Sequence, residues 1–218
     1  MTYKQIVKLF VPTKSKYGFV LNKGFFYKKS NNILFAISFE KPSKLLYCTF
    51  FLIPLWVPTD TIYYTYGNRI NNLEMARVAP LNLDSSCEQV TSWVDNISDA
   101  LEATVFPLFE TIRTPRGLLS YLNEVQGNTR GLIFCPPDKM DVLKINLLLF
   151  LEEYDAASRE IICAKKRLSK MDCYTDRVKE EMLMELQKLQ KLISENQEHS
   201  LHAHFKKIIC DNCRLFSI

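Results

Sequence analysis

The sequence predicts an α+β fold: an N-terminal helix, a mostly antiparallel sheet of about five strands packed by helices, and an all-α C-terminal third. Two observations carry this prediction. Short runs of aromatic and β-branched residues alternate with turn residues at hairpin distances over residues 17–66. No glycine or proline follows Pro137, which favours uninterrupted helices from there to the end of the chain. The 218 residues are 47% hydrophobic and 24% charged, as in an ordinary folded protein.

The first elements are a short helix and the strands. Apolar residues at helical spacing predict a helix over residues 2–10 that Pro12 ends. The strands are expected at five runs rich in aromatic and β-branched residues: 17–21, 25–27, 33–39, 47–53 and 61–66. The turns between the first four carry asparagine, glycine, serine or proline, so these strands read as an antiparallel meander.

The chain then becomes helical. Ser85 followed by Glu88 forms a capping-box pattern at the start of a helix that runs to Val105, just before Phe106-Pro107. Thr114 and Pro115 predict the start of a second helix over 116–124. Three further helices are expected at 139–152, 154–170 and 174–205. We therefore divide the chain into a sheet domain, 1–130, and a helical region, 131–218.

The helix predicted at 174–205 carries an apolar stripe. Its members recur at steps of three and four residues: Val178, Met182, Leu186, Leu189 and Ile193. A stripe of about three turns favours a face that packs within the molecule over a coiled coil. A homodimer through the C-terminal helices stays open as an alternative.

The composition disfavours an enzyme. The six glycines are isolated, so no glycine-rich phosphate-binding loop is present. The three histidines all lie among the last twenty residues, and no nucleophile with a nearby histidine can be assembled in the first 198. We predict no catalytic residue and no cofactor.

Charge is unevenly distributed along the chain. Through residue 45 there are nine lysines and one acid, Glu40, whereas residues 72–112 contain seven acids and one arginine, Arg77. The net charge is only +4. This pattern predicts pairing between the two segments or a surface with two signs of charge.

The cysteines indicate the cell compartment. There are seven, an odd number without regular spacing, and the first residues lack the apolar core of a signal peptide. The longest apolar run, 49–57, is far shorter than the roughly 20 residues of a membrane-spanning helix. We expect a cytoplasmic protein with no membrane segment.

Several motifs together resemble a bacterial family of unknown function, over residues 3–125. They are Tyr17-Gly18-Phe19, the aromatic segment 24–28, the strand 34–39, the Pro-Leu-x-Val-Pro segment 54–60 and Tyr66-Gly67-Asn68-Arg69. The resemblance implies an α+β fold and no established activity. It also implies a bacterial accessory or immunity-type protein.

Aromatic residues and one arginine mark the predicted binding site. Trp56, Tyr64, Tyr66 and Arg69 are residue types enriched at protein interfaces. The sequence therefore predicts a non-enzymatic, cytoplasmic bacterial protein-binding module of the immunity or phage-defence accessory kind, whose partner is another protein or a second copy. The strict alternation of a strand lets only half of these side chains face the core, and coverage of the rest by the Val90–Val105 helix is the default expectation.

The first alternative is a nucleic-acid-binding accessory protein. Lys23, Lys28 and Lys29 alternate with the rings of residues 25–27, a combination that nucleic-acid-binding proteins use. The rings of strands more often fill a core.

A zinc-containing adaptor is the other alternative. Near the C-terminus, His202 and His204 precede the Cys210-x-x-Cys213 pair, and these four residue types bind zinc. In the competing interpretation the histidines belong to a solvated helix face, and we predict no metal.

Overall fold

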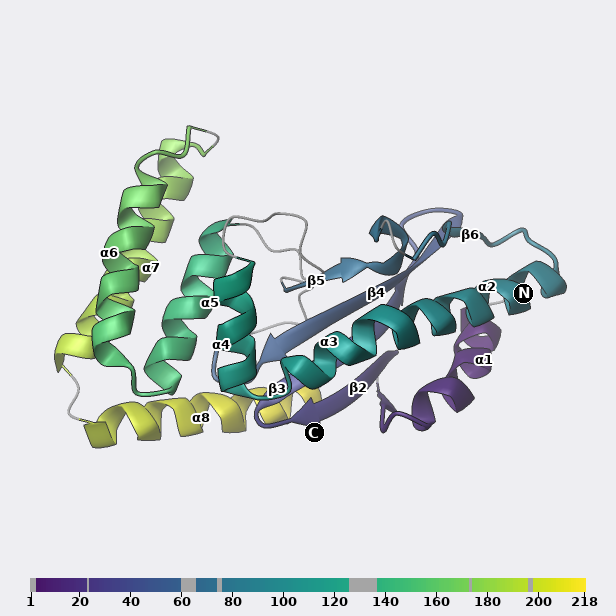
Figure 1. Ribbon diagram of the computed structural model, residues 1–218, viewed down its shortest axis with the longest axis horizontal. Helices are drawn as coiled ribbons and strands as arrows, with labels where there is room; N and C mark the ends of the chain where they lie inside the picture. Colours follow the sequence, from purple (N-terminus) through teal and green to yellow (C-terminus); the bar gives the residue numbers. More distant parts are fainter. Residues whose placement is uncertain are drawn as a thin grey trace. The chain divides into compact units, whose positions relative to one another are not determined.

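The computed structural model describes residues 3–22, 24–59, 66–73, 76–125, 137–172, 174–195 and 198–218 (Figure 1). It confirms the predicted α+β fold, with an N-terminal helix, an antiparallel sheet and a mostly helical C-terminal region. The chain forms two compact units. Unit 1 comprises residues 1–53, 64–114 and 128–134, and unit 2 comprises 54–63, 115–127 and 135–218. The division into independent domains 1–130 and 131–218 stays a prediction.

Unit 1 is built on the sheet. Its strands follow chain order: β1 (Val20–Asn22), β2 (Phe25–Ser30), β3 (Ile33–Glu40), β4 (Leu45–Pro54) and β5 (Tyr66–Arg69). β6 (Leu81–Asn82) pairs with the start of β4. Most of the predicted strand 61–66 lies outside the described residues, and β5 begins only at Tyr66. A Cβ on Gly67 would overlap the backbone of Phe50, so glycine is what allows β5 to approach β4.

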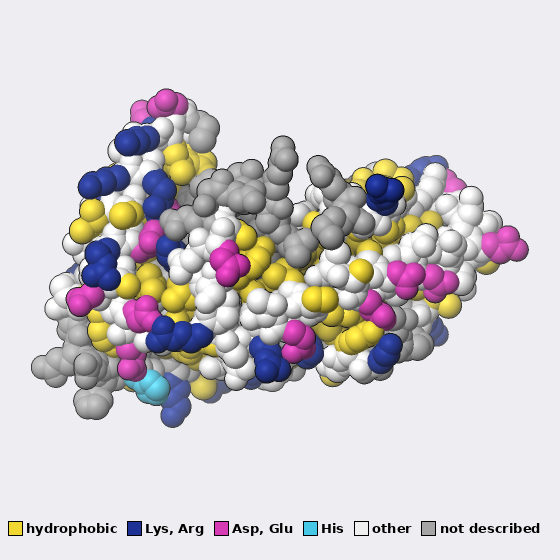
Figure 2. Space-filling model, in the orientation of Figure 1, with side chains coloured by type: hydrophobic (Ala, Val, Ile, Leu, Met, Phe, Trp, Pro, Cys, Tyr) yellow, Lys and Arg dark blue, Asp and Glu magenta, His cyan; other side chains and the backbone are white. Residues whose placement is uncertain are grey.

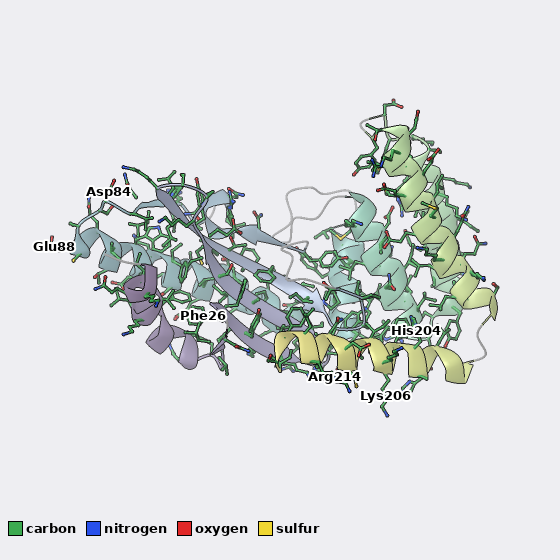
Figure 3. The ribbon with its side chains drawn as sticks, turned by 180° about the vertical axis from the view of Figure 1, so that it is seen from behind. Phe26, Asp84, Glu88, His204, Lys206 and Arg214 are labelled. Atoms are coloured by element: carbon green, nitrogen blue, oxygen red, sulfur yellow. The ribbon has the colours of Figure 1, made fainter. Side chains whose placement is uncertain are left out.

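The two faces of the sheet separate its aromatic residues. The register places Phe26 opposite Ile37 and Lys28 opposite Phe35, so these side chains share one face. This face is covered by α1 (Tyr3–Ser15), α2 (Cys87–Ala100) and α3 (Phe106–Thr111). The ring of Phe10 in α1 meets the ring of Phe26 edge-on, with the two ring centroids 5.0 Å apart. Figure 3 shows the position of Phe26 on the sheet near α1. One part of the core of unit 1 therefore lies between the sheet and these helices, and side chains on the other face of β3 and β4, such as Leu34 and Phe51, are buried as well.

The end of the first helix differs from the prediction. α1 does not end at Pro12 but continues to Ser15. A proline inside a helix removes the bond to the carbonyl four residues earlier. Here that carbonyl belongs to the exposed Lys8, where water can replace the missing donor.

The capping box lies one residue later than predicted. Ser86 Oγ accepts from the Gln89 N–H at 3.3 Å, and Gln89 Oε1 accepts from the Ser86 N–H at 2.8 Å. The N–H of Ser85 donates instead to the carbonyl of Asn82, which commits Ser85 to the preceding turn.

The helix after the sheet also does not stop at Phe106. Residues Leu101–Val105 form a π-helical segment, and α3 continues directly from it. The Phe106 N–H donates to the carbonyl of Leu101, five residues earlier. In a regular α-helix the ring of Pro107 would clash with the carbonyl of residue 103, and the wider π turn relieves that clash.

Unit 2 is helical. It contains α4 (Pro115–Glu124), α5 (Pro137–Phe150), α6 (Tyr154–Leu168), α7 (Asp176–Glu195) and α8 (Glu198–Phe216). The start of α4 at Pro115 confirms the prediction. The single helix predicted over 174–205 is wrong, because α7 ends at Glu195 and α8 is a separate helix. No helix in the described parts of the chain is both long and apolar enough to cross a membrane.

The apolar stripe of α7 packs inside unit 2. Met182 and Leu186 are buried and the other members of the stripe are half-buried. α7 packs against α5 and α6. This supports the predicted intramolecular role of the stripe.

Charged side chains also join α5 to α6. Arg167 bonds Asp141 at 2.7 Å and Glu160 at 2.5 Å, and Lys144 contacts Glu160 at 2.8 Å. The side chain of Arg167 is 36% exposed, and the other three side chains are between 12% and 16% exposed. The four residues form a largely buried network of alternating charge.

Candidate functional site

The sequence-predicted binding residues lie in different environments. Trp56 is fully buried in unit 2 and stacks on Phe150 with ring centroids 4.7 Å apart. Tyr66 is 7% exposed on β5 of unit 1. Tyr64 lies outside the described residues. Trp56 and Tyr66 are therefore core residues, and their role in binding stays a prediction.

Arg69 has partners within unit 1. Its Nη2 and Nε atoms donate to Glu40 Oε2 at 2.6 and 3.1 Å, and its guanidinium lies 4.5 Å from the centre of the Tyr47 ring. The Thr49 hydroxyl donates to Glu40 Oε1 at 2.7 Å. The register that places Thr49 opposite Arg69 builds this cluster on the sheet face away from the helices. Arg69 is thus held by internal contacts.

The predicted pairing of the lysine-rich and acidic segments is present. Lys28 contacts Glu110 at 2.9 Å, and Lys44 contacts Asp84 at 3.2 Å. These pairs are at least partly exposed, so each contributes little to stability. Their effect is to reduce the charge on both segments.

The lysine and aromatic hairpin does not present its rings. Phe26 and Tyr27 are 1% and 4% exposed, and Phe25 is half-buried. Lys28 is paired with Glu110, and Lys23 lies outside the described residues. Rings in a core cannot stack on bases, so this geometry does not support the nucleic-acid alternative at the hairpin.

The residues of the zinc alternative are spread along α8. His202 and Cys210 are eight residues apart on one helix, or about 12 Å at a helical rise of ~1.5 Å per residue. His204 points to the opposite side of the helix from His202, at about 200° of rotation. Within the described residues, no three histidine, cysteine or acidic side chains are close enough to share a metal ion. Figure 3 shows His204 on α8, where it is exposed.

A cavity of unit 1 lies where the edge of the sheet meets the π-helical segment Leu101–Val105 and α3. It has a volume of about 270 Å³. Its lining consists of four aromatic residues, a proline and three charged residues: Tyr17, Phe19, Phe106, Phe109, Pro107, Lys28, Glu102 and Glu110. We call this the aromatic pocket. Ligand pockets for drug-sized molecules measure roughly 300–1,000 Å³, so this one suits a single large side chain better.

The π-helical segment shapes the aromatic pocket. Phe106 directly follows the segment, and its ring lies 4.4 Å from Tyr17 and 5.7 Å from Phe19. Glu102 belongs to the segment itself. Single π turns within helices are often found at functional sites.

An exposed strand lies beside the aromatic pocket. β1 directly follows Phe19 and pairs with β2, and no other described strand pairs with it. Val20 is 67% exposed and Leu21 is 43% exposed. Proteins usually protect such edges with charges, prolines or bulges. An apolar unpaired edge next to a pocket is therefore a candidate for binding another chain.

Charged groups surround the mouth of the aromatic pocket. The hydrogen bond from Lys28 lowers the pKa of Glu110, which also contacts Arg113 at 3.3 Å. A hydrogen bond with Tyr17, and then the charge of Glu102, raise the pKa of Lys16. The mouth of the pocket therefore contains both signs of charge, close to balance.

Acidic side chains without a basic counterpart in the described chain lie further along α2. Glu88, Asp95 and Asp99 are exposed, and none of them forms an ion pair within the described residues. Figure 2 shows acidic side chains spaced along this helix. With Glu102 they recur at steps of seven, four and three residues, so they lie on one side of the helix. We call these four residues the acidic ridge.

Sequence reasoning did not find the aromatic pocket. Its lining comes from segments more than 80 residues apart in the chain, for example Phe19 and Phe106. The available signal is the proline inside the helical pattern at Pro107, which by itself predicts the end of a helix. Comparison of the chain with protein-family models, curated proteins and solved structures finds no match.

Proposed function

We propose that this protein is a non-enzymatic protein-binding module whose partner docks on β1 and inserts a side chain into the aromatic pocket. The observation that carries the proposal is the edge strand β1, in which Val20 is 67% exposed and which directly follows Phe19 of the aromatic pocket. Binding energy at protein interfaces is concentrated in a few large side chains that fill pockets of the partner.

The setting of this function is also a proposal. The odd, irregularly spaced cysteines support a cytoplasmic location. The resemblance of residues 3–125 to a bacterial family supports an immunity or defence accessory role.

Site-specific photo-crosslinking tests the proposal. A photoreactive amino acid replaces Val20 in one version of the full chain and Ile162 of α6 in a matched control. Ile162 is similarly exposed, at 53%, but belongs to unit 2. We expect a discrete crosslinked protein from the Val20 probe in the native cell extract and none from the Ile162 probe.

A second variant connects the crosslink to the aromatic pocket. Ala103 is exposed and adjoins the pocket-lining Glu102, so Ala103→Trp should obstruct the approach to the pocket and reduce the Val20 crosslink. A crosslink that is unchanged in this variant, or that forms equally from Ile162, would contradict docking at this surface.

A further inference from the structure

We infer that the partner contributes an extended basic segment, which adds to β1 as a further strand and places one large apolar side chain in the aromatic pocket. This inference rests on the proposed function and specifies its ligand. Three features of unit 1 support it: the backbone of β1, the face on which the pocket lies, and the charge of α2.

The backbone of β1 favours a strand as the ligand. β1 is antiparallel to β2, with Val20 opposite Tyr27 and Leu21 opposite Phe26. Its other side is unpaired by any described strand, and backbone N–H and C=O groups alternate along such an edge. An added strand satisfies these groups through main-chain hydrogen bonds and is selected by its alternate side chains.

The position of the aromatic pocket fixes which side chains are selected. Side chains alternate along β1, so Phe19 and Leu21 share the face of Phe26 and Lys28, the face that α2 and α3 cover. A strand added beside β1 lies about 4.8 Å away, and every second side chain points to that same face. One of these side chains reaches the pocket that Phe19 lines.

The charge of α2 sets the charge of the segment. The mouth of the pocket is close to neutral because Lys28 is bonded to Glu110 and Lys16 lies near Glu102. The rest of the acidic ridge has no cation paired with it in the described residues. Asp99 lies about one turn of helix, or roughly 5 Å, from Glu102, within reach of a lysine or arginine next to the anchor. Complementary charge suppresses wrong partners and speeds association.

Selection of peptides tests this ligand class directly. A library of random twelve-residue peptides displayed on phage is selected on the full-length protein. We expect enriched peptides to contain one aromatic or large aliphatic residue, with lysine or arginine within a few positions and no proline beside the anchor. Enrichment of acidic peptides, or no enrichment, would overturn the inference.

Backbone methylation distinguishes an added strand from other modes of binding. The best peptide is synthesised with N-methyl groups on every second residue, in two sets offset by one residue. Because only alternate N–H groups of a strand face its neighbour, one set should weaken binding by about tenfold or more and the other only slightly. Equal effects of both sets in fluorescence anisotropy would contradict strand addition.

Charge reversal tests the acidic ridge. Asp99→Lys with Glu102→Lys should weaken binding of the basic peptide by about tenfold and favour the same peptide with its lysines changed to glutamate. Glu180→Lys on α7, an exposed acid in unit 2, is the matched control and should leave binding unchanged. Circular dichroism establishes that each variant is folded, and the methylated peptides need no variant.

The two proposals fail separately. A Val20 crosslink to a native partner, together with peptides that are acidic or insensitive to methylation, would overturn the basic strand and leave the protein-binding function standing. Absence of both the crosslink and peptide enrichment would overturn both.

Discussion

Asn212 shows how much one side chain can determine. It is 2% exposed on α8, and its Nδ2 atom donates to the carbonyls of Leu55 and Val57, each at 2.8 Å. The N–H of Val57 in turn donates to the Pro54 carbonyl. One amide therefore fixes the turn that follows β4 and keeps Trp56 against Phe150.

We expect Asn212→Ala to lower the free energy of unfolding by about 2–4 kcal/mol, because the buried carbonyl of Leu55 and the part-buried carbonyl of Val57 lose their donor. The change in the urea midpoint measures this. Asn96→Ala on the exposed face of α2 is the control for the change in helix propensity and should alter stability by less than about 0.5 kcal/mol. Similar effects of the two substitutions would show that the Asn212 hydrogen bonds contribute little.

A second residue-scale feature is the turn between β2 and β3. Asn31 and Asn32 have φ angles of 45° and 65°, so both lie in the left-handed region. A two-residue hairpin loop with this conformation is the type I′ turn, in which asparagine and glycine are favoured. The turn was predicted from the sequence because asparagine tolerates this conformation without help from distant residues.

We expect Asn32→Gly to keep or slightly raise stability, and Asn32→Val to lower the free energy of unfolding by about 1–2 kcal/mol, since a β-branched residue is strained at positive φ. Thermal unfolding of the two variants beside the wild type measures the difference. If Asn32→Val is as stable as Asn32→Gly, the turn does not keep this conformation in solution.

At the scale of elements, the contact between α5 and α6 depends on charge. Burial raises the pKa of Asp141, and the hydrogen bond from Arg167 only partly offsets it. Burial acts in the same sense on Glu160, but the hydrogen bonds from Lys144 and Arg167 outweigh it and lower the pKa of Glu160. The two carboxyl groups therefore link stability to pH with opposite signs.

The sign for each follows from proton binding. Between the lowered pKa of Glu160 and its ordinary value, the unfolded chain binds more protons than the folded chain. The stability that Glu160 contributes is therefore lost as the pH falls through the folded-state pKa. For Asp141, the folded chain binds more protons than the unfolded chain at pH values just above the ordinary pKa of an aspartate. The stability that protonated Asp141 contributes is therefore lost as the pH rises.

We expect Glu160→Gln to make stability fall less steeply with acid, and Asp141→Asn to make it fall more steeply. Urea midpoints measured between about pH 3 and 6 cover the ordinary range of both groups. The slopes are compared rather than the absolute stabilities, because either variant leaves Arg167 with one carboxylate fewer. Slopes that change in the same direction would contradict the opposite roles of the two carboxyl groups.

The elements also show where sequence reasoning succeeds and where it does not. The β2–β3 hairpin and the start of α4 depend on local chemistry, namely two asparagines and a proline at the first helical position. The helix end predicted at Val105 is wrong because the π turn accommodates Pro107, and a pattern of apolar residues does not distinguish a stopped helix from a widened one. The capping box was displaced by one residue because Asn82 engages Ser85.

At the scale of the molecule, the chain passes between its two units several times. Residues 54–59 follow the longest strand of unit 1 yet pack with helices of unit 2, where Trp56 meets Phe150. A fragment of residues 1–130 keeps Trp56 but lacks Phe150 and Asn212.

We expect that fragment to expose Trp56 and to show red-shifted tryptophan emission. The chain has two tryptophans, so Trp93→Phe in both the fragment and the full chain isolates Trp56. The full chain carrying Trp93→Phe is the control and should emit as a buried tryptophan does. Blue emission and cooperative unfolding of the fragment would instead support an independent domain over 1–130.

The sequence by itself determined the α+β class, the hairpins and the start of α4, because periodicity and turn chemistry act over a few residues. The uneven charge left two outcomes open, pairing of lysines with acids or a surface with two signs of charge. Only the tertiary structure decided that Trp56 and Tyr66 are buried, that Arg69 is held by Glu40, and that Phe19 and Phe106 meet in the aromatic pocket beside an unpaired β1. Burial and pocket formation depend on which distant segments pack together, and a list of residue types along one chain does not contain that information.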